Sequence, residues 1–153
     1  MELHSHLEQL IPAAANWILK QENHILKCGI DLSIDQAIDA HLIGVKDPSR
    51  IRLMEFEEMP KPEDTELHKA AEFLGLISDS TRGTSFRYGI AVRKGWLASR
   101  TLLVHEMTHT TQYEKLGGIE NFLKQYILEC STVGYLLSPM EEEARKMERK
   151  ICG

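Results

Sequence analysis

The stretch Leu102-Leu103-Val104-His105-Glu106-Met107-Thr108-His109 decides which fold is expected, because it has the form H-E-x-x-H. On an α-helix, residues four apart lie on the same face, so the rings of His105 and His109 would project side by side. Two imidazoles so placed can hold one metal ion, and Glu106 can reach a water molecule that the metal polarises. The stretch therefore predicts a helix that carries part of a zinc hydrolase site.

A buried helix can also carry two histidines for packing or hydrogen bonding alone. The flanking residues argue against this alternative, because the apolar residues 102–104 would bury the helix and leave its polar residues to line an internal cleft. The two variable positions, Met107 and Thr108, carry no charge. The metal-site interpretation is therefore preferred.

The composition indicates a single globular domain over residues 1–153. Of these residues 42% are hydrophobic and 27% are charged, which is ordinary for a globular protein. The net charge of −5 argues against a nucleic-acid partner, because phosphate binding needs clustered lysine and arginine.

The cysteines and the first residues bear on the expected compartment. The three cysteines are widely spaced and form no C-x-x-C pair, which favours free thiols in a reducing compartment. The first residues do not resemble a signal peptide, and the apolar stretch around residues 11–19 is too short to cross a bilayer. A cytoplasmic protein without a membrane partner is expected, although leaderless secretion would leave no trace in the sequence.

The order of predicted elements gives an α+β fold that is mainly helical, with a small antiparallel or mixed sheet. Periodicity and end signals predict helices at about 12–28, 33–44, 67–74, 99–116, 119–133 and 138–147. Strands are predicted at 51–56 and 85–93, and the second is the clearer because apolar residues alternate with polar or small ones, which predicts a half-buried strand. Residues 1–50 would form a helical N-terminal region, and 51–153 would supply the sheet, the metal helix and a ligand helix.

Two histidines need a third partner, because catalytic zinc usually has three protein ligands and a water molecule. A third histidine six residues after His109 would indicate a metzincin, but that position is Lys115. A peptide deformylase would need an upstream glycine-cysteine motif, and Cys28 is too distant. A glutamate from a later helix remains, and the dense acidic cluster downstream lies at 139–144.

These segments together resemble the gluzincin-type zinc metallopeptidases, most closely a group of small bacterial proteins of that class. The resemblance is carried by Gly89-Ile90, Trp96, the H-E-x-x-H stretch, Gln112-Tyr113-Glu114, Gly134-Tyr135 and Pro139-Met140-Glu141-Glu142-Glu143-Ala144. It covers the C-terminal half of the chain with specific motifs and implies a zincin-like fold, with H-E-x-x-H on an active-site helix and Zn²⁺ as the cofactor.

In gluzincins the glutamate ligand stands three residues before an alanine, which corresponds to Glu141, with Glu143 as the runner-up. Ser138 and Glu141 also have the spacing of a capping box, and a glutamate engaged in a helix cap would not be free to bind metal. Several gluzincin families place an aspartate directly after the alanine. Arg145 stands there in this chain, so that carboxylate is missing or supplied elsewhere.

The resemblance implies zinc held by His105, His109 and Glu141, with Glu106 as the general base. Tyr135 is a candidate for stabilising the oxyanion. The expected function is a zinc-dependent hydrolase, most specifically a small metallopeptidase that acts on a peptide or protein substrate. The alternative is a zinc-bearing regulatory or partner-binding domain of the same fold without proteolytic activity.

Two further expectations concern the surroundings of the metal helix. Tyr113 is a weaker candidate for the oxyanion role, and a packing role is preferred for it. The strand predicted over 86–92 precedes the metal helix, and its free edge is expected to pair with an extended substrate by β-augmentation.

Overall fold

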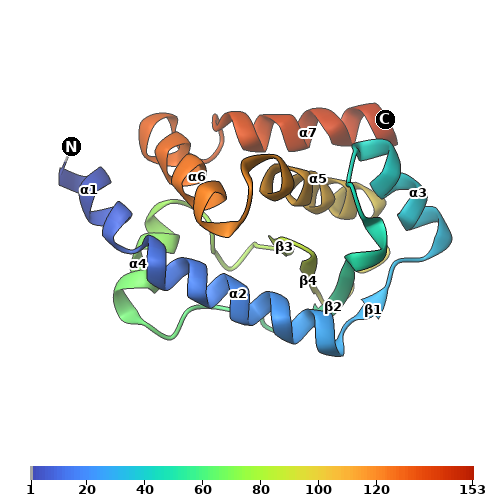
Figure 1. Cartoon of the computed structure of the whole chain (residues 1–153), viewed down its shortest axis with the longest axis horizontal. Coiled ribbons are helices and arrows are strands. Elements are labelled where there is room, and N and C mark those ends of the chain that lie inside the picture. The colour runs from blue at the N-terminus through green and yellow to red at the C-terminus, as the bar shows by residue number, and fades with distance from the viewer. Residues whose placement is uncertain (1) are drawn as a thin grey trace.

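The computed structural model describes residues 2–153, and their side chains from Ser5 onward. Over this range the chain forms seven α-helices, one short 3-10 helix and a four-stranded mixed sheet (Figure 1). The elements in chain order are α1 (Glu2–Gln9), α2 (Ile11–Cys28), β1 (Ile30–Asp31), α3 (Ile34–Ile43), η1 (Pro48–Arg50), β2 (Arg52–Phe56), α4 (Thr65–Phe73), β3 (Gly83–Phe86), β4 (Gly89–Arg93), α5 (Arg100–Leu116), α6 (Ile119–Val133) and α7 (Pro139–Cys152). The predicted α+β class with a mixed sheet is confirmed.

The sheet has the strand order β1-β2-β4-β3. β2 and β4 are parallel, with Leu53 opposite Ile90, and the other two pairs are antiparallel. β4 lies inside the sheet, with helices on both faces: Ile90 packs in one core cluster with Val104 of α5, and Ala91 packs in the other with Ile25 of α2.

The prediction of one half-buried strand over 85–93 is wrong, because the chain turns back within it and forms the hairpin β3–β4. Phe86 pairs with Gly89, so Arg87 and Tyr88 form the turn, and Arg87 has a φ of 68°. That left-handed conformation is uncommon for a residue with a side chain. The sequence here also lacks the Asn-Gly pair that usually predicts a two-residue hairpin turn. β4 is also buried on both faces rather than one, because α2 and α5 enclose it.

Contacts from α2 hold this turn. The Arg87 guanidinium donates two hydrogen bonds to the Glu22 carboxylate, at 2.8 and 2.7 Å, and the backbone N–H of Tyr88 donates to the same carboxylate at 3.0 Å. Glu22 is buried, so its charge is compensated in place by these donors.

The predicted helices are all present, with ends that differ by a few residues. The capping box predicted at the start of α3 is confirmed: Ser33 accepts from the backbone of Gln36 at 3.2 Å, and Gln36 accepts from the backbone of Ser33 at 2.8 Å. Helix α1 and the short strand β1 were not predicted. No helix within residues 2–153 has the length and apolar character needed to cross a membrane.

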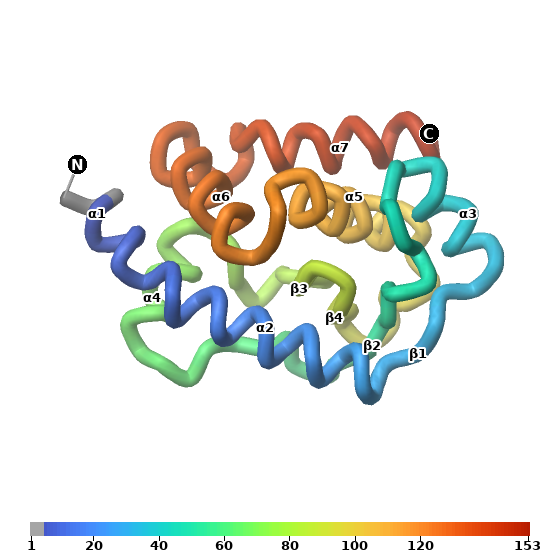
Figure 2. The backbone as a smooth tube through the Cα atoms, in the orientation of Figure 1, coloured from blue at the N-terminus to red at the C-terminus, as the bar shows by residue number. Residues whose placement is uncertain are grey.

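The arrangement of α5 and α7 positions the candidate site. Figure 2 shows the two helices side by side along one edge of the molecule, with α2 on the far side of the sheet. Side chains far apart in sequence therefore meet between α5 and α7.

Candidate metal centre

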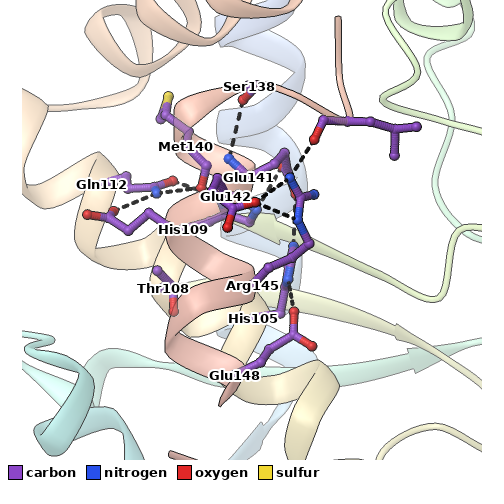
Figure 3. A network of polar contacts seen from close by, with 12 residues as sticks. His105, Thr108, His109, Gln112, Ser138, Met140, Glu141, Glu142, Arg145 and Glu148 are labelled. Atoms are coloured by element: carbon purple, nitrogen blue, oxygen red, sulfur yellow. Dashed lines mark hydrogen bonds and ion pairs between the residues drawn. The ribbon is translucent and has the colours of Figure 1, made fainter. Parts of the chain in front are cut away.

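Two well-defined helix starts set the register of the site. Ser99 caps α5, where its hydroxyl accepts from the backbone N–H of Leu102 at 3.2 Å. Ser138 caps α7, with Pro139 in the first turn. Glu141 therefore lies in the first turn of α7, facing the middle of α5 (Figure 3).

The two histidines of the motif meet Glu141. His105 Nε2 lies 2.9 Å from one carboxylate oxygen of Glu141, and His109 Nε2 lies 3.0 Å from the other. One ligand atom from each of the three residues lies within 4.8 Å of the other two. His109 and Glu141 are buried, and the His105 side chain is 15% exposed. The three residues thus form a group that could hold a metal ion.

The outer nitrogen of each ring also has a partner. His105 Nδ1 lies 2.5 Å from a carboxylate oxygen of Glu148, and His109 Nδ1 lies 2.7 Å from the amide oxygen of Gln112. The Gln112 amide nitrogen donates to the Met140 carbonyl at 3.0 Å and to Glu143 at 2.7 Å. Because the nitrogen of that amide is committed to two acceptors, its oxygen must accept from the Nδ1–H of His109.

This arrangement could hold a metal ion. Histidines that bind metals usually donate their other ring N–H to a carboxylate or carbonyl group, which fixes the tautomer and directs the second nitrogen at the metal. Two imidazole nitrogens and one carboxylate are also a common ligand set of catalytic zinc.

The helix-cap alternative does not occupy the Glu141 carboxylate. The Ser138 hydroxyl accepts from the backbone N–H of Glu141 at 3.2 Å, but the Ser138 N–H donates to the Tyr135 carbonyl at 3.3 Å instead of to Glu141. The carboxylate turns to the histidines and to Tyr126, whose hydroxyl donates a hydrogen bond to it. Glu141 thus starts the helix with its backbone and faces the site with its side chain.

The structure brings Glu141 to the histidines and leaves the runner-up Glu143 outside the group. Glu143 accepts from Gln112, so it lies behind His109. A carboxylate does lie next to the group, that of Glu148, two helical turns after Glu141 on the same face of α7, where it contacts His105 Nδ1. Arg145 itself pairs with Glu142.

Sequence reasoning did not identify three of these neighbours, Gln112, Tyr126 and Glu148. Gln112 follows His109 by three residues, so helical spacing was a usable signal for it. Tyr126 is part of the apolar stripe of α6, and the signal was a hydroxyl that needs a partner when buried. Glu148 carries no signal of its own until α7 is placed beside α5.

Opposite charges dominate the electrostatics of the group. Burial opposes protonation of His105, but the hydrogen bond to Glu141 and the charges of Glu106 and Glu141 outweigh it and raise the pKa of His105 to about 9. The pKa of His109 is also raised, since the same carboxylates outweigh its burial. Burial acts to raise the pKa of Glu141, but hydrogen bonds from both histidines hold it well below its usual range.

Glu106 lies next to His105 on α5 and is 6% exposed. Burial raises the pKa of Glu106, although the neighbouring histidine charges and a hydrogen bond from the backbone of Ser85 work in the opposite direction. A carboxylate with a raised pKa is a better proton acceptor than an exposed one, which suits it to acid–base chemistry.

The two tyrosines differ in their surroundings. Tyr135 borders the cavities beside the histidines, and burial followed by the charge of Glu141 raises its pKa, so its hydroxyl keeps its proton. Tyr113 stacks on Phe122 with ring centroids 3.7 Å apart and donates to the Ser85 carbonyl at 3.2 Å. The contacts of Tyr113 are therefore those of a packing residue.

The free edge expected for the strand at 86–92 belongs to β3 instead, because β4 is paired on both sides. Both backbone groups of Ser85 are used by α5, the N–H by Glu106 and the carbonyl by Tyr113. The added Cβ of a residue at Gly83 would lie 3.1 Å from Glu106 Cγ. β3 thus packs closely on the metal helix, which restricts where a substrate strand could pair.

Comparison of the chain with protein-family models, with curated protein sequences and with solved structures finds no match.

Proposed function

We propose that this chain is a zinc-dependent hydrolase that cleaves peptide bonds, with His105, His109 and Glu141 as the zinc ligands. The observation that carries the proposal is that both inner ring nitrogens meet one buried carboxylate, while each outer nitrogen already has a partner. This is the arrangement expected of a catalytic zinc site, with three protein ligands and a further position for water.

When bound, zinc supplies a Lewis acid that polarises a carbonyl group and lowers the pKa of water. Glu106 takes the proton of the attacking water and returns it to the leaving amine, a role that its raised pKa supports. Tyr135 keeps its proton and borders the cavities, so it can donate a hydrogen bond to the oxyanion that forms on the substrate carbonyl. Glu148 and Gln112 hold the two rings in orientation.

Two features favour catalysis over a non-catalytic zinc module. A structural zinc site usually has four protein ligands, whereas the group found within the described residues has three. Glu106 borders two cavities next to the histidines, and a purely structural site has no need of this carboxylate there.

The test combines metal analysis with a peptide-library digest. We expect the purified wild type to bind zinc, the Glu141→Ala variant to lose it, and the matched Glu143→Ala variant to retain it. Glu106→Gln should keep zinc yet lose hydrolysis by about 10²–10⁴-fold, since general-base catalysis contributes that much.

Full metal content in Glu141→Ala, or unchanged hydrolysis in Glu106→Gln, would contradict the proposal. Zinc binding without cleavage of any peptide would support the regulatory or partner-binding alternative.

A further inference from the structure

Two cavities of different character meet at the candidate site. Both are bordered by Leu76, Gly83, His105, Glu106 and Tyr135. A bond held against Glu106 would therefore lie next to both cavities.

The first cavity is apolar and enclosed by helices. Its walls come largely from the N-terminal helices, α4 and α6, and include Leu7, Ala14, Trp17, Ala70, Leu74 and Ile127. Apart from the site residues and the hydroxyl groups of Thr84 and Ser85, the lining is mostly aliphatic and aromatic. A polar group placed there would lose its contacts with water without gaining hydrogen bonds, so the cavity disfavours one.

The second cavity is wider and polar. Its lining includes Ser78, Ser80, Thr81, Arg82 and Thr101. The Arg82 guanidinium stacks over the Trp96 ring at 4.1 Å. Hydroxyl and guanidinium groups can form hydrogen bonds with a polar group of a substrate. The two cavities therefore differ in the kind of substrate group that each can bind.

The size of the apolar cavity limits its occupant. Its volume is about 150 Å³. An apolar cavity of about 150 Å³ holds one benzene molecule, so this one is matched to a single ring or a branched aliphatic side chain and is too small for a long acyl chain.

We infer that the apolar cavity receives one aromatic or branched aliphatic side chain of the substrate, next to the bond that is cleaved, while the residue on the other side of that bond faces the polar cavity. The inference rests on the proposed function for the cleavage step alone. Binding of the apolar group depends only on the cavity. The preferred substrate is thus a peptide in which a bulky apolar residue adjoins a polar one.

The helix α2 offers a matched pair of variants to test this. Ala14 lines the cavity, whereas the adjacent Ala13 is exposed. Ala14→Leu would fill the cavity, and Ala13→Leu adds the same side chain to the same helix at a solvent-facing position. Ala70→Leu fills the cavity from another helix, α4, and guards against a local defect in α2.

The first experiment measures binding of two probes, N-acetyl-L-phenylalaninamide and N-acetyl-L-alaninamide. Binding of each probe is monitored by two-dimensional NMR spectra of the purified protein. In the wild type and in Ala13→Leu, the phenylalanine probe should bind about tenfold or more tightly than the alanine probe, as expected for an apolar pocket. Ala14→Leu and Ala70→Leu should lose this difference while their spectra remain those of a folded protein.

The cleavage arm uses the peptide library. Wild-type cuts should lie beside bulky apolar residues, and Ala14→Leu should shift them toward small residues. Equal binding of the two probes by the wild type, or retention of the difference by both filled variants, would overturn the inference. Selective phenylalanine binding without cleavage of any peptide would refute the proposed hydrolysis and uphold the cavity's ligand class.

Discussion

At the scale of single residues, the orientation of the two histidines depends on side chains that are not metal ligands. Glu148 accepts from His105 (Figure 3). Gln112 accepts from His109, and the amide nitrogen of Gln112 donates to Glu143. Each ring therefore has its outer nitrogen already fixed, which would lower the cost of ordering the site if a metal ion bound there.

Glu148→Gln should weaken zinc binding about 10–100-fold, because the neutral amide no longer raises the basicity of His105 as a carboxylate does. The measurement is competition for zinc against a chromophoric chelator. Glu142→Gln is the matched control, since Glu142 lies on the same helix, is exposed, and pairs only with Arg145 and Arg149 among the described ion pairs. Equal affinities in Glu148→Gln and the wild type would show that Glu148 is dispensable for orientation.

At the scale of secondary-structure elements, the β3–β4 hairpin sets the position of the strand beside the metal helix. Its turn contains a residue with a positive φ, and the buried Glu22 carboxylate from α2 compensates that residue's charge. β3 in turn contacts Glu106 through Gly83 and Ser85. The ion pair between Arg87 of the hairpin and Glu22 of α2 is therefore expected to affect both the stability of the fold and the position of β3 beside Glu106.

Arg87→Ala should lower the free energy of unfolding by about 3 kcal/mol, because it leaves the Glu22 carboxylate buried without its charged partner. Chemical denaturation measures the change. Lys94→Ala is the control, since Lys94 pairs with the largely exposed Glu57, and loss of such a surface pair should cost less than about 1 kcal/mol. Similar losses in the two variants would contradict the role assigned to Glu22.

At the scale of the whole molecule, the candidate site joins two helices that packing and the hydrogen bonds of Gln112 also hold together. His105 and His109 belong to α5, and Glu141 belongs to α7. A metal ion bound by all three would link these helices, and any ligand that binds only the folded state stabilises it by an amount that grows with the logarithm of the ratio of its concentration to its Kd.

The stability of the metal-free protein should fall as the pH rises from about 6.5 to about 9. The pKa of His105 is raised from 6.5 to about 9 in the folded chain, so its contribution is fully present below pH 6.5 and is lost as the pH rises through 9. Zinc competes with protons for the same nitrogens. The increase in Tm caused by zinc should therefore be larger at pH 9 than at pH 6.

Thermal unfolding with and without a chelator at the two pH values measures this difference. His109→Ala serves as the control, because removal of one proposed ligand should abolish the chelator effect at both pH values. A zinc-induced shift that is the same at both pH values would contradict the assignment of His105.

The prediction from sequence succeeded where the signals are local. Helix ends are marked by residues within one turn of them, so the helices could be predicted. Examples are the capping residues Ser33 and Ser99 and the glycine after Leu116. The hairpin could not be predicted, because alternation of apolar residues is the same for one strand as for two, and the contact that holds the turn comes from Glu22, 65 residues before Arg87.

The sequence by itself determined the spacing of His105, Glu106 and His109, because a helix places residues four apart on one face whatever surrounds it. Only the tertiary structure decided that Glu141 meets both histidines, that Glu143 lies behind Gln112, and that Glu148 supports His105. These pairings depend on the side-by-side packing of α5 and α7, and the rotation of one helix against another is set by the whole buried interface rather than by any local sequence signal.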